Sequence, residues 1–147
     1  MTTFGLIDKA FALKKCPLFE DLDLEMLLAI TDHVGAVSFN EGEKIFHIEE
    51  EDTRGYIIVE GSVQICNTDD EPIATLTPSE FFGDEALFSA TAPRYQATAT
   101  TDCLLLTLSR STLYTIIAEY PTIALKLLQH YAKATPFRQR QTEEASS

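Results

Sequence analysis

The sequence has few basic residues. It contains 11 Lys and Arg residues against 23 Asp and Glu residues, which gives a formal net charge of −12. Binding to a phosphate backbone needs concentrated positive charge, so this balance predicts no nucleic-acid partner. The segment KLLQHYAKATPFRQR, residues 126–140, is basic and free of acids. It is typical of a solvated helix end, with a surface for an acidic partner as the alternative.

Long apolar runs and export signals are also lacking. No run of about 18 apolar residues is present, and the N-terminal stretch MTTFGLIDKAFALKKC has no continuous apolar part that ends in a cleavage site. Cysteine is scarce: Cys16, Cys66 and Cys103 are odd in number and far apart, which predicts neither a disulfide framework nor a CxxC motif. We therefore expect a cytoplasmic protein with no membrane partner.

Catalytic and metal-binding motifs are missing as well. The sequence contains no GxSxG, HExxH, GxxxxGK[ST] or GxGxxG, and His33, His47 and His130 lie in separate segments without ligand spacing. No nucleophile, base and orienting group can be assembled from these residues. We expect neither an enzyme nor a metal site.

The residues that are present predict one α+β domain, residues 1–147. Apolar residues recur at helical spacing in residues 1–34, where Asp21 or Asp23 can cap a helix whose apolar face is expected to hold Leu24, Leu27, Leu28 and Val34. Helical spacing returns in residues 109–134, where Ser109 or Ser111 can cap and Pro121 can begin a second helix. Residues 135–147 are polar and expected to be a flexible tail.

Between these helices, residues 35–108 consist of short apolar or alternating runs broken by turn residues. This spacing predicts an antiparallel β-roll, similar to a jelly roll, of about seven or eight strands flanked by helices. The seven runs are AVSF, KIFHI, GYIIVE, SVQIC, PIATL, YQATAT and CLLLTL.

The stretch FGDEALFSATAPRYQAT, residues 82–98, carries the candidate binding chemistry. Gly83 permits a sharp turn, and residues 84–87 read as one helical turn whose free N–H groups attract an anion. Arg94, folded back over that turn, would hold a phosphate from a second side, and Asp84 would accept hydrogen bonds from sugar hydroxyls. The alternative is purely structural: Asp84 caps the turn, Glu85 is solvated, and Arg94 pairs with a surface acid.

The chain resembles the cyclic nucleotide-binding domain family, the β-roll module of the catabolite activator protein, protein kinase A regulatory subunits and cyclic-nucleotide-gated channels. The resemblance rests on FNEGEKIF, GYIIVEGSVQI, EFFGDEALF and APRYQATATTDCLLLTLSR, in that order, with Gly42 and Gly61 at turn positions. It implies a regulatory or sensor module that binds cAMP or cGMP. The implied ligand-binding residues are Phe82, Gly83, Asp84, Glu85, Ala86, Leu87, Arg94, Tyr95, Gln96 and Ala97, with Tyr131 and Phe137 as candidates for a lid over the base.

Several positions depart from the family pattern. Asp84 stands where the family usually has Glu, the spacing from Gly83 to Arg94 is one residue longer, and Tyr95 and Gln96 follow Arg94 where small residues are usual. Tyr95 either crowds the purine or points outward. These departures favour an alternative function, a degenerate roll that binds no nucleotide and associates with itself or a regulated partner through its C-terminal helix. Activators of this type resemble a roll followed by a helix-turn-helix domain, for which the sequence after the last helix is too short.

Overall fold

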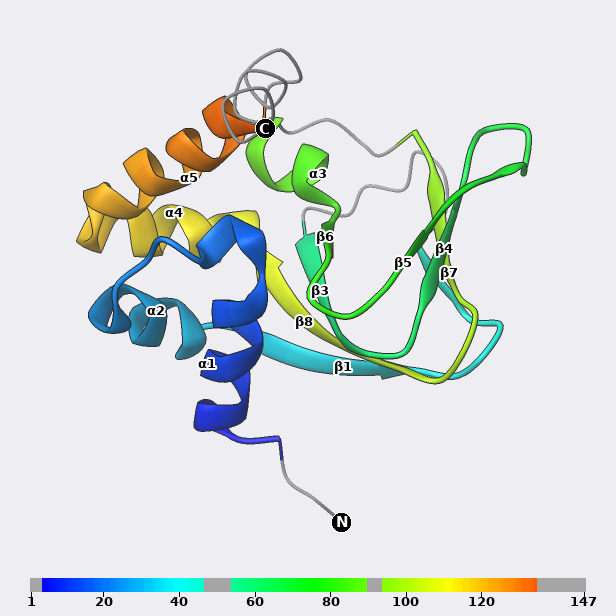
Figure 1. The fold of residues 1–147 in the computed structure, drawn as a ribbon, viewed down its shortest axis with the longest axis horizontal. Coiled ribbons are helices and arrows are strands. Elements are labelled where there is room, and N and C mark those ends of the chain that lie inside the picture. Colours follow the sequence, from blue (N-terminus) through cyan, green and yellow to red (C-terminus); the bar gives the residue numbers. More distant parts are fainter. Residues whose placement is uncertain (1–3, 47–53, 90–93, 135–147) are drawn as a thin grey trace, which may run out of the picture.

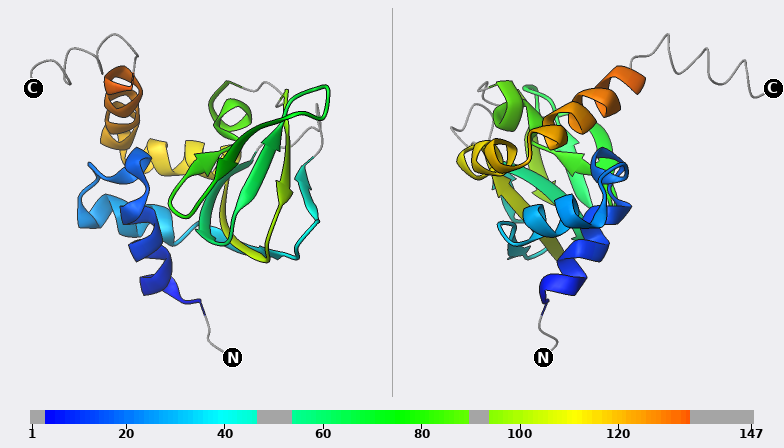
Figure 2. Two further views of the ribbon diagram at one scale, coloured as in Figure 1. Left: turned by 45° about the vertical axis from the view of Figure 1, so that its right-hand side comes forward. Right: turned by 90° about the vertical axis from the view of Figure 1, so that its left-hand side faces the viewer.

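Two four-stranded antiparallel sheets face each other and form a β-roll, and helices cover one end of it (Figure 1). The computed structural model describes residues 4–46, 54–89 and 94–134. Figure 2 shows that the N-terminal and C-terminal helices gather on the same side of the roll, whereas α3 lies over the roll itself. The predicted fold class, an antiparallel roll flanked by helices, is confirmed.

The helices are α1 (Leu6–Lys15), the 3-10 turn η1 (Pro17–Phe19), α2 (Leu24–Thr31), α3 (Asp84–Ser89), α4 (Arg110–Glu119) and α5 (Pro121–Lys133). The strands are β1 (Gly35–Phe39), β2 (Lys44–Phe46), β3 (Arg54–Glu60), β4 (Val63–Cys66), β5 (Pro72–Leu76), β6 (Phe81–Phe82), β7 (Gln96–Ala99) and β8 (Cys103–Ser109).

The helix ends follow the predicted capping chemistry. The Asp23 side chain accepts a hydrogen bond from the Met26 N–H at 2.9 Å, and the Ser109 hydroxyl accepts one from the Thr112 N–H at 3.2 Å. Each bond satisfies one of the N–H groups that a helix leaves without a backbone partner. Pro121 occupies the first turn of α5, where its missing N–H costs nothing.

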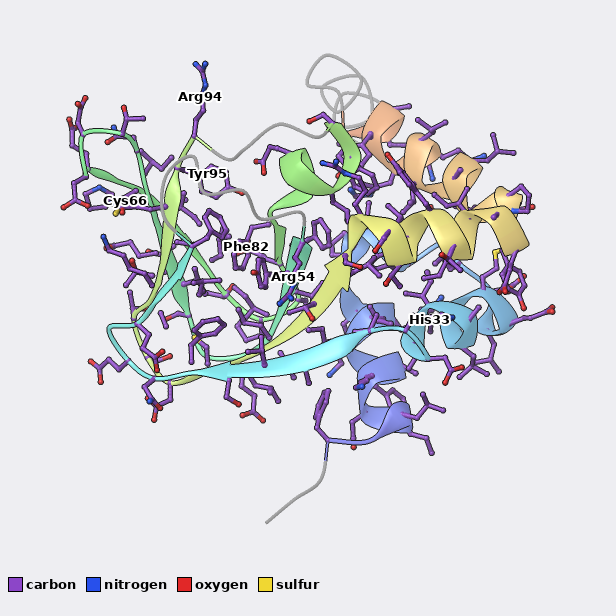
Figure 3. All side chains as sticks on the ribbon, turned by 180° about the vertical axis from the view of Figure 1, so that it is seen from behind. His33, Arg54, Cys66, Phe82, Arg94 and Tyr95 are labelled. Atoms are coloured by element: carbon purple, nitrogen blue, oxygen red, sulfur yellow. The ribbon has the colours of Figure 1, made fainter. Side chains whose placement is uncertain are left out.

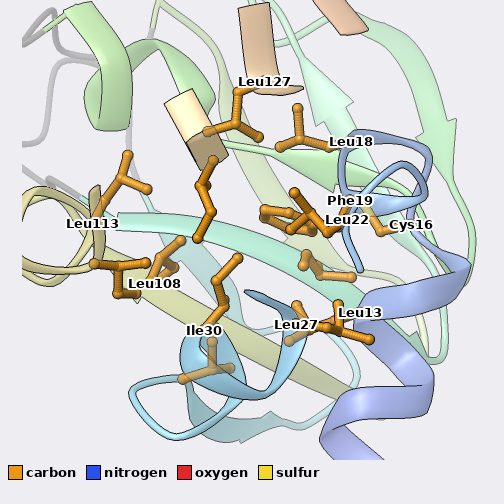
Figure 4. Close-up of a cluster of buried hydrophobic side chains, with 14 of the residues drawn as sticks. Leu13, Cys16, Leu18, Phe19, Leu22, Leu27, Ile30, Leu108, Leu113 and Leu127 are labelled. Carbon is orange, nitrogen blue, oxygen red and sulfur yellow. The ribbon is translucent and has the colours of Figure 1, made fainter. Parts of the chain in front are cut away.

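Strands β3 and β8 form the longest ladder of the roll and separate two hydrophobic cores. One sheet has the order β1-β8-β3-β6 and the other β2-β7-β4-β5. Successive side chains of a strand point to opposite faces. Ile57 and Leu106 accordingly pack against the helices, while Ile58 and Leu105 pack inside the roll. Figure 4 shows the helical core, to which α1, η1, α2, α4 and α5 contribute leucines such as Leu13 and Leu127.

The short strand β6 was not among the seven predicted runs. Its two residues pair with β3, at Tyr56↔Phe82 and Ile57↔Phe81. A two-residue strand is too short to show alternation, so the sequence carries no periodic signal for it. This pairing fixes the backbone directly ahead of Gly83 and therefore positions the candidate site.

The predicted apolar face of α2 is partly wrong. Leu27 is buried as expected, but Leu24 and Leu28 are 68% and 41% exposed, and the buried face runs through Leu27, Ile30 and Thr31. On α1, Ile7 and Phe11 are also exposed, at 70% and 66%. These exposed side chains line a groove of about 440 Å³ between α1 and α2.

The structure also bears on the expectations about membrane helices, cysteines and the C-terminal tail, within the residues that it describes. No helix in the described ranges combines the length and the apolar character needed to cross a membrane. Cys16, Cys66 and Cys103 are free thiols and buried. The predicted tail, residues 135–147, lies outside the described residues, as do Phe137 and His47.

Candidate functional site

The turn at Gly83 begins the segment that the sequence singles out. Gly83 has φ +82°, and a Cβ atom built there would lie 2.7 Å from the Arg54 carbonyl oxygen. Only glycine meets both conditions without strain. The turn passes directly into α3, which begins at Asp84 and extends two residues beyond the predicted helical turn.

Two apolar side chains hold the turn in place. Leu87, on α3, is fully buried in the helical core. Phe82, just before Gly83, is 3% exposed and stacks on Tyr56 with the ring centroids 5.3 Å apart. These two predicted site residues therefore act through packing in this structure. Ala86 is the third residue of α3.

Tyr95 points into the roll and reaches the Gly83 turn. The Gly83 N–H donates a hydrogen bond to the Tyr95 hydroxyl at 2.9 Å, and that hydroxyl donates to the Glu85 carboxylate at 2.9 Å. The Tyr95 ring also packs against Phe46, with centroids 5.3 Å apart. Of the two orientations left open by the sequence, the structure has the inward one (Figure 3). The Gly83 N–H, directly before the helical turn whose N–H groups are expected to attract an anion, is thus occupied by a hydroxyl of the same chain.

Arg94 points the other way. Its side chain is exposed and extends away from the roll, opposite to Tyr95 (Figure 3). It makes no hydrogen bond or ion pair with another residue of the described segments. Arg94 and Tyr95 lie in a bend directly before β7, and their side chains leave the backbone on opposite sides (Figure 3). The structure therefore does not bring Arg94 to Gly83.

The carboxylate of Asp84 is bonded to the C-terminal helix. The Tyr131 hydroxyl donates to Asp84 Oδ2 at 2.7 Å, and the Tyr131 ring meets Phe88 edge-on with centroids 5.7 Å apart. Together with residues of α4 and α5, these side chains line a groove of about 510 Å³. Tyr131, predicted as a lid, thus connects α5 to α3. Sequence reasoning missed this contact because 47 residues separate the two partners.

Gln96 and Ala97 have structural partners. Gln96 is buried, its amide N–H donates to Asp70, and its carbonyl oxygen accepts from Lys44 Nζ at 3.1 Å. These contacts connect β7 with the β4–β5 turn and with β2. Ala97 is fully buried inside the roll. Small size at this position lets the aromatic side chains of the roll interior pack closely.

Burial also changes the acidity of three groups near the site. It raises the pKa of the Tyr95 hydroxyl above the usual tyrosine range, and the Glu85 carboxylate adds to the effect. Burial, followed by the hydrogen bond to Asp84, raises the pKa of Tyr131 in the same direction. Burial raises the pKa of the Cys16 thiol from 9.0 to about 11. All three groups are therefore protonated at neutral pH, and Cys16 has no thiolate character there.

These shifts predict a loss of stability at alkaline pH. The folded state holds the three protons more tightly than the unfolded state, so their contribution is complete below the unfolded pKa values and is lost as the pH rises above about 9 for Cys16 and about 10 for the tyrosines. The loss is at most about 1.4 kcal/mol per pH unit for each proton. Urea unfolding at pH 8 and pH 10.5 measures it.

A matched variant tests the cause of this alkaline effect. Tyr131→Phe removes one of the titrating groups. It is expected to be less stable than the wild type at pH 8, because the hydrogen bond to Asp84 is lost. Between pH 8 and pH 10.5 it should lose less stability than the wild type. Equal losses in the two proteins would assign the alkaline effect to other groups.

Within the described ranges, no three His, Cys, Asp or Glu side chains gather as metal ligands. The groups available at the site are one backbone N–H, two carboxylates and two phenol hydroxyls, from Gly83, Asp84, Glu85, Tyr95 and Tyr131. Each of them is hydrogen-bonded to another member of this set, so a ligand that binds here by hydrogen bonds must replace one of these contacts.

Comparison with known proteins identifies the family of this chain. Residues 36–120 match the model of the cyclic nucleotide-binding domain. The chain belongs to this family. The region matched to the cyclic nucleotide-binding domain runs from the second residue of β1 through β8 and includes the Gly83 turn and Arg94.

Two curated relatives are similar to the chain over most of its length. They are the CRP-like cAMP-activated global transcriptional regulators of Mycobacterium tuberculosis strains CDC 1551 / Oshkosh and ATCC 25618 / H37Rv, each 26% identical over 125 residues. The match covers 82% of this chain and 56% of each regulator. The chain thus spans little more than half the length of these relatives.

Solved structures agree with this assignment. The N-terminal domain of a transcriptional regulator from Streptomyces coelicolor A3(2) has a TM-score of 0.76 and 29% identity, over 91% of this chain and 96% of that one. The Thermus thermophilus Catabolite Activator Protein has a TM-score of 0.71 and 24% identity, over 88% of this chain and 63% of that one. The second likeness shows the fold alone.

Proposed function

We propose that the chain is a regulatory module that binds a cyclic nucleotide at the Gly83 turn, with cAMP as the preferred ligand. The Gly83 N–H carries this proposal: Gly83 is buried in a turn with positive φ, and its N–H already donates to an oxygen at 2.9 Å. A phosphate oxygen accepts such a bond more strongly than a phenol, because the acceptor is charged. The printed name of the Mycobacterium tuberculosis relatives supports cAMP.

Arg94 and Asp84 complete the proposed contacts. Arg94 would pair with the phosphate and Asp84 would accept from a sugar hydroxyl, although both groups have other positions in this structure. A threonine directly after the arginine, which favours guanine in the family, is replaced by Tyr95 and Gln96. This replacement favours cAMP over cGMP.

The output of the module is proposed to run through α5. Tyr131 connects α5 to Asp84, so a ligand that takes the Asp84 carboxylate competes with that contact. Binding would then shift the population toward a state in which α5 has a different position, because a ligand favours the state that binds it better. The two sites are coupled in both directions.

Isothermal titration calorimetry tests the proposal. The protein is titrated with cAMP, with cGMP, and with 5′-AMP as a control that carries a phosphate but no cyclic ring. We expect saturable heat with cAMP, weaker binding of cGMP, and little with 5′-AMP. Absence of heat with both cyclic nucleotides at millimolar concentration would refute cyclic nucleotide binding.

Two observations favour a second function, association with a protein partner without nucleotide binding. The Tyr95 hydroxyl occupies the Gly83 N–H, and Leu125 and Leu128 on α5 are 60% and 65% exposed. An exposed apolar helix face is typical of a surface that binds a second copy or a partner. Sedimentation velocity with and without cAMP separates the two functions, since association of a nucleotide-independent module ignores the ligand. The absence of a nucleic-acid partner, which the charge balance predicts, stays a prediction.

A further inference from the structure

The Tyr95 hydroxyl sits in the hydrogen-bonding position that a ligand oxygen would need. It accepts the Gly83 N–H and donates to Glu85, both at 2.9 Å. Its ring contributes to the roll interior through Phe46. Tyr95 is therefore fixed by three contacts from three elements: the β6–α3 turn, α3 and β2.

We propose that Tyr95 is an internal competitor for the Gly83 N–H, which sets the affinity of the site for phosphate-bearing ligands. This inference rests on the proposed function and adds its regulation. A ligand phosphate must displace the hydroxyl before it can accept from Gly83. Apparent affinity is then reduced by the fraction of molecules in which Tyr95 has left the turn.

The position of Arg94 follows from the same competition. Arg94 and Tyr95 are neighbours in a bend, and their side chains point to opposite sides, with Tyr95 toward the turn (Figure 3). With Tyr95 inward, the guanidinium is in solvent and the phosphate site lacks its cation. Departure of Tyr95 removes the competing hydroxyl and allows Arg94 to turn inward. The ligand thus selects a state in which the two side chains have exchanged places.

Glu85 makes the closed state, in which the Tyr95 hydroxyl is bonded to Gly83 and Glu85, selective among anions. Its carboxylate accepts from the hydroxyl of Tyr95, and a carboxylate repels a phosphate at short range. The Tyr95 hydroxyl donates to the Glu85 carboxylate and, by accepting from the Gly83 N–H, keeps a ligand phosphate from accepting that bond. Weakly bound anions that lack further contacts, such as inorganic phosphate, should therefore fail to open the site.

The test compares Tyr95→Phe with the wild type by titration with cAMP. Phenylalanine keeps the ring against Phe46 and removes only the hydroxyl, so the Gly83 N–H loses its partner in the closed state. An unsatisfied buried donor raises the free energy of that state. We expect cAMP to bind Tyr95→Phe about tenfold more tightly than the wild type. Tyr114→Phe is the control, because Tyr114 is 60% exposed on α4.

A second measurement checks the contact itself. Hydrogen exchange of the Gly83 amide, followed by NMR, should be faster in Tyr95→Phe and unchanged in Tyr114→Phe. Unchanged exchange in Tyr95→Phe would show that the hydroxyl does not hold this amide and would overturn the inference.

The possible titration results separate the inference from the proposed function. Tighter binding by Tyr95→Phe, or binding by this variant alone, supports the competition. Equal or weaker binding by Tyr95→Phe, with a wild type that binds, overturns the competition and leaves nucleotide binding in place. Absence of binding by both proteins overturns nucleotide binding and the competition with it.

Discussion

Arg94→Ala is expected to lower the affinity for cAMP by about 100-fold. An arginine that pairs with a phosphate makes charge-assisted hydrogen bonds, worth about 1.5–3 kcal/mol each, and each 1.4 kcal/mol changes affinity tenfold. Isothermal titration calorimetry measures the change. In the structure Arg94 is exposed and has no hydrogen bond or ion pair with other described residues, so its loss should leave the melting temperature unchanged.

This lack of contacts makes the variant a clean test of the phosphate role. A drop in affinity at constant melting temperature can only come from the bound state. Lys15→Ala, on the exposed surface of α1, removes the same charge and should bind like the wild type. Arg94→Lys should give an intermediate affinity, because lysine keeps the charge but loses the planar two-pronged geometry. Wild-type affinity in Arg94→Ala would mean that the phosphate is held without this residue.

Gly61→Ala should destabilise the protein by about 3 kcal/mol, from backbone strain of ~1–2 kcal/mol and a steric clash. Gly61 has φ +94° in the connection between β3 and β4. A Cβ atom there would lie 2.4 Å from the Asp102 carbonyl oxygen and 2.7 Å from Cys103 Sγ. Neither the backbone oxygen nor the buried sulfur can move without disturbing β8. Urea unfolding of the variant measures the change.

Gly42→Ala is the matched control for this prediction. Gly42 has nearly the same φ, +90°, but a Cβ atom there would meet nothing within 4 Å. It should lose only the strain of the left-handed backbone, ~1–2 kcal/mol. The difference between the two variants isolates the clash at Asp102 and Cys103. Equal losses would show that the surroundings of Gly61 relax freely.

Local sequence signals predicted the elements and the turn of the site. Gly83 followed by residues 84–87 carries the mark of a turn and a helix start, and both are present. The caps at Asp23 and Ser109 and the start of α5 at Pro121 are equally local. Each of these features is decided by residues within one helical turn.

Features that depend on distant pairing could not be predicted. Arg94 and Tyr95 lie in the bend that leads into β7, so the orientation of their side chains depends on where β7 pairs, through Ile65↔Ala97 on β4 and the irregular pairing with β2. These partners are about 30 and 50 residues away in the sequence, beyond the reach of a local signal. The exposure of Leu24 and Leu28 likewise depends on how α2 packs against its neighbours, since helical spacing leaves the angle of the buried face open.

Strands β3 and β8, which contribute side chains to both cores, have a consequence for unfolding. Ile57 and Ile58 are adjacent on β3 but belong to different cores, and the same is true of Leu105 and Leu106 on β8. Departure of the helical layer would expose one face of these strands to water and weaken the ladder that encloses the aromatic interior. The helices and the roll should therefore melt in a single cooperative transition, and amides of β3 and β8 should exchange only by global opening.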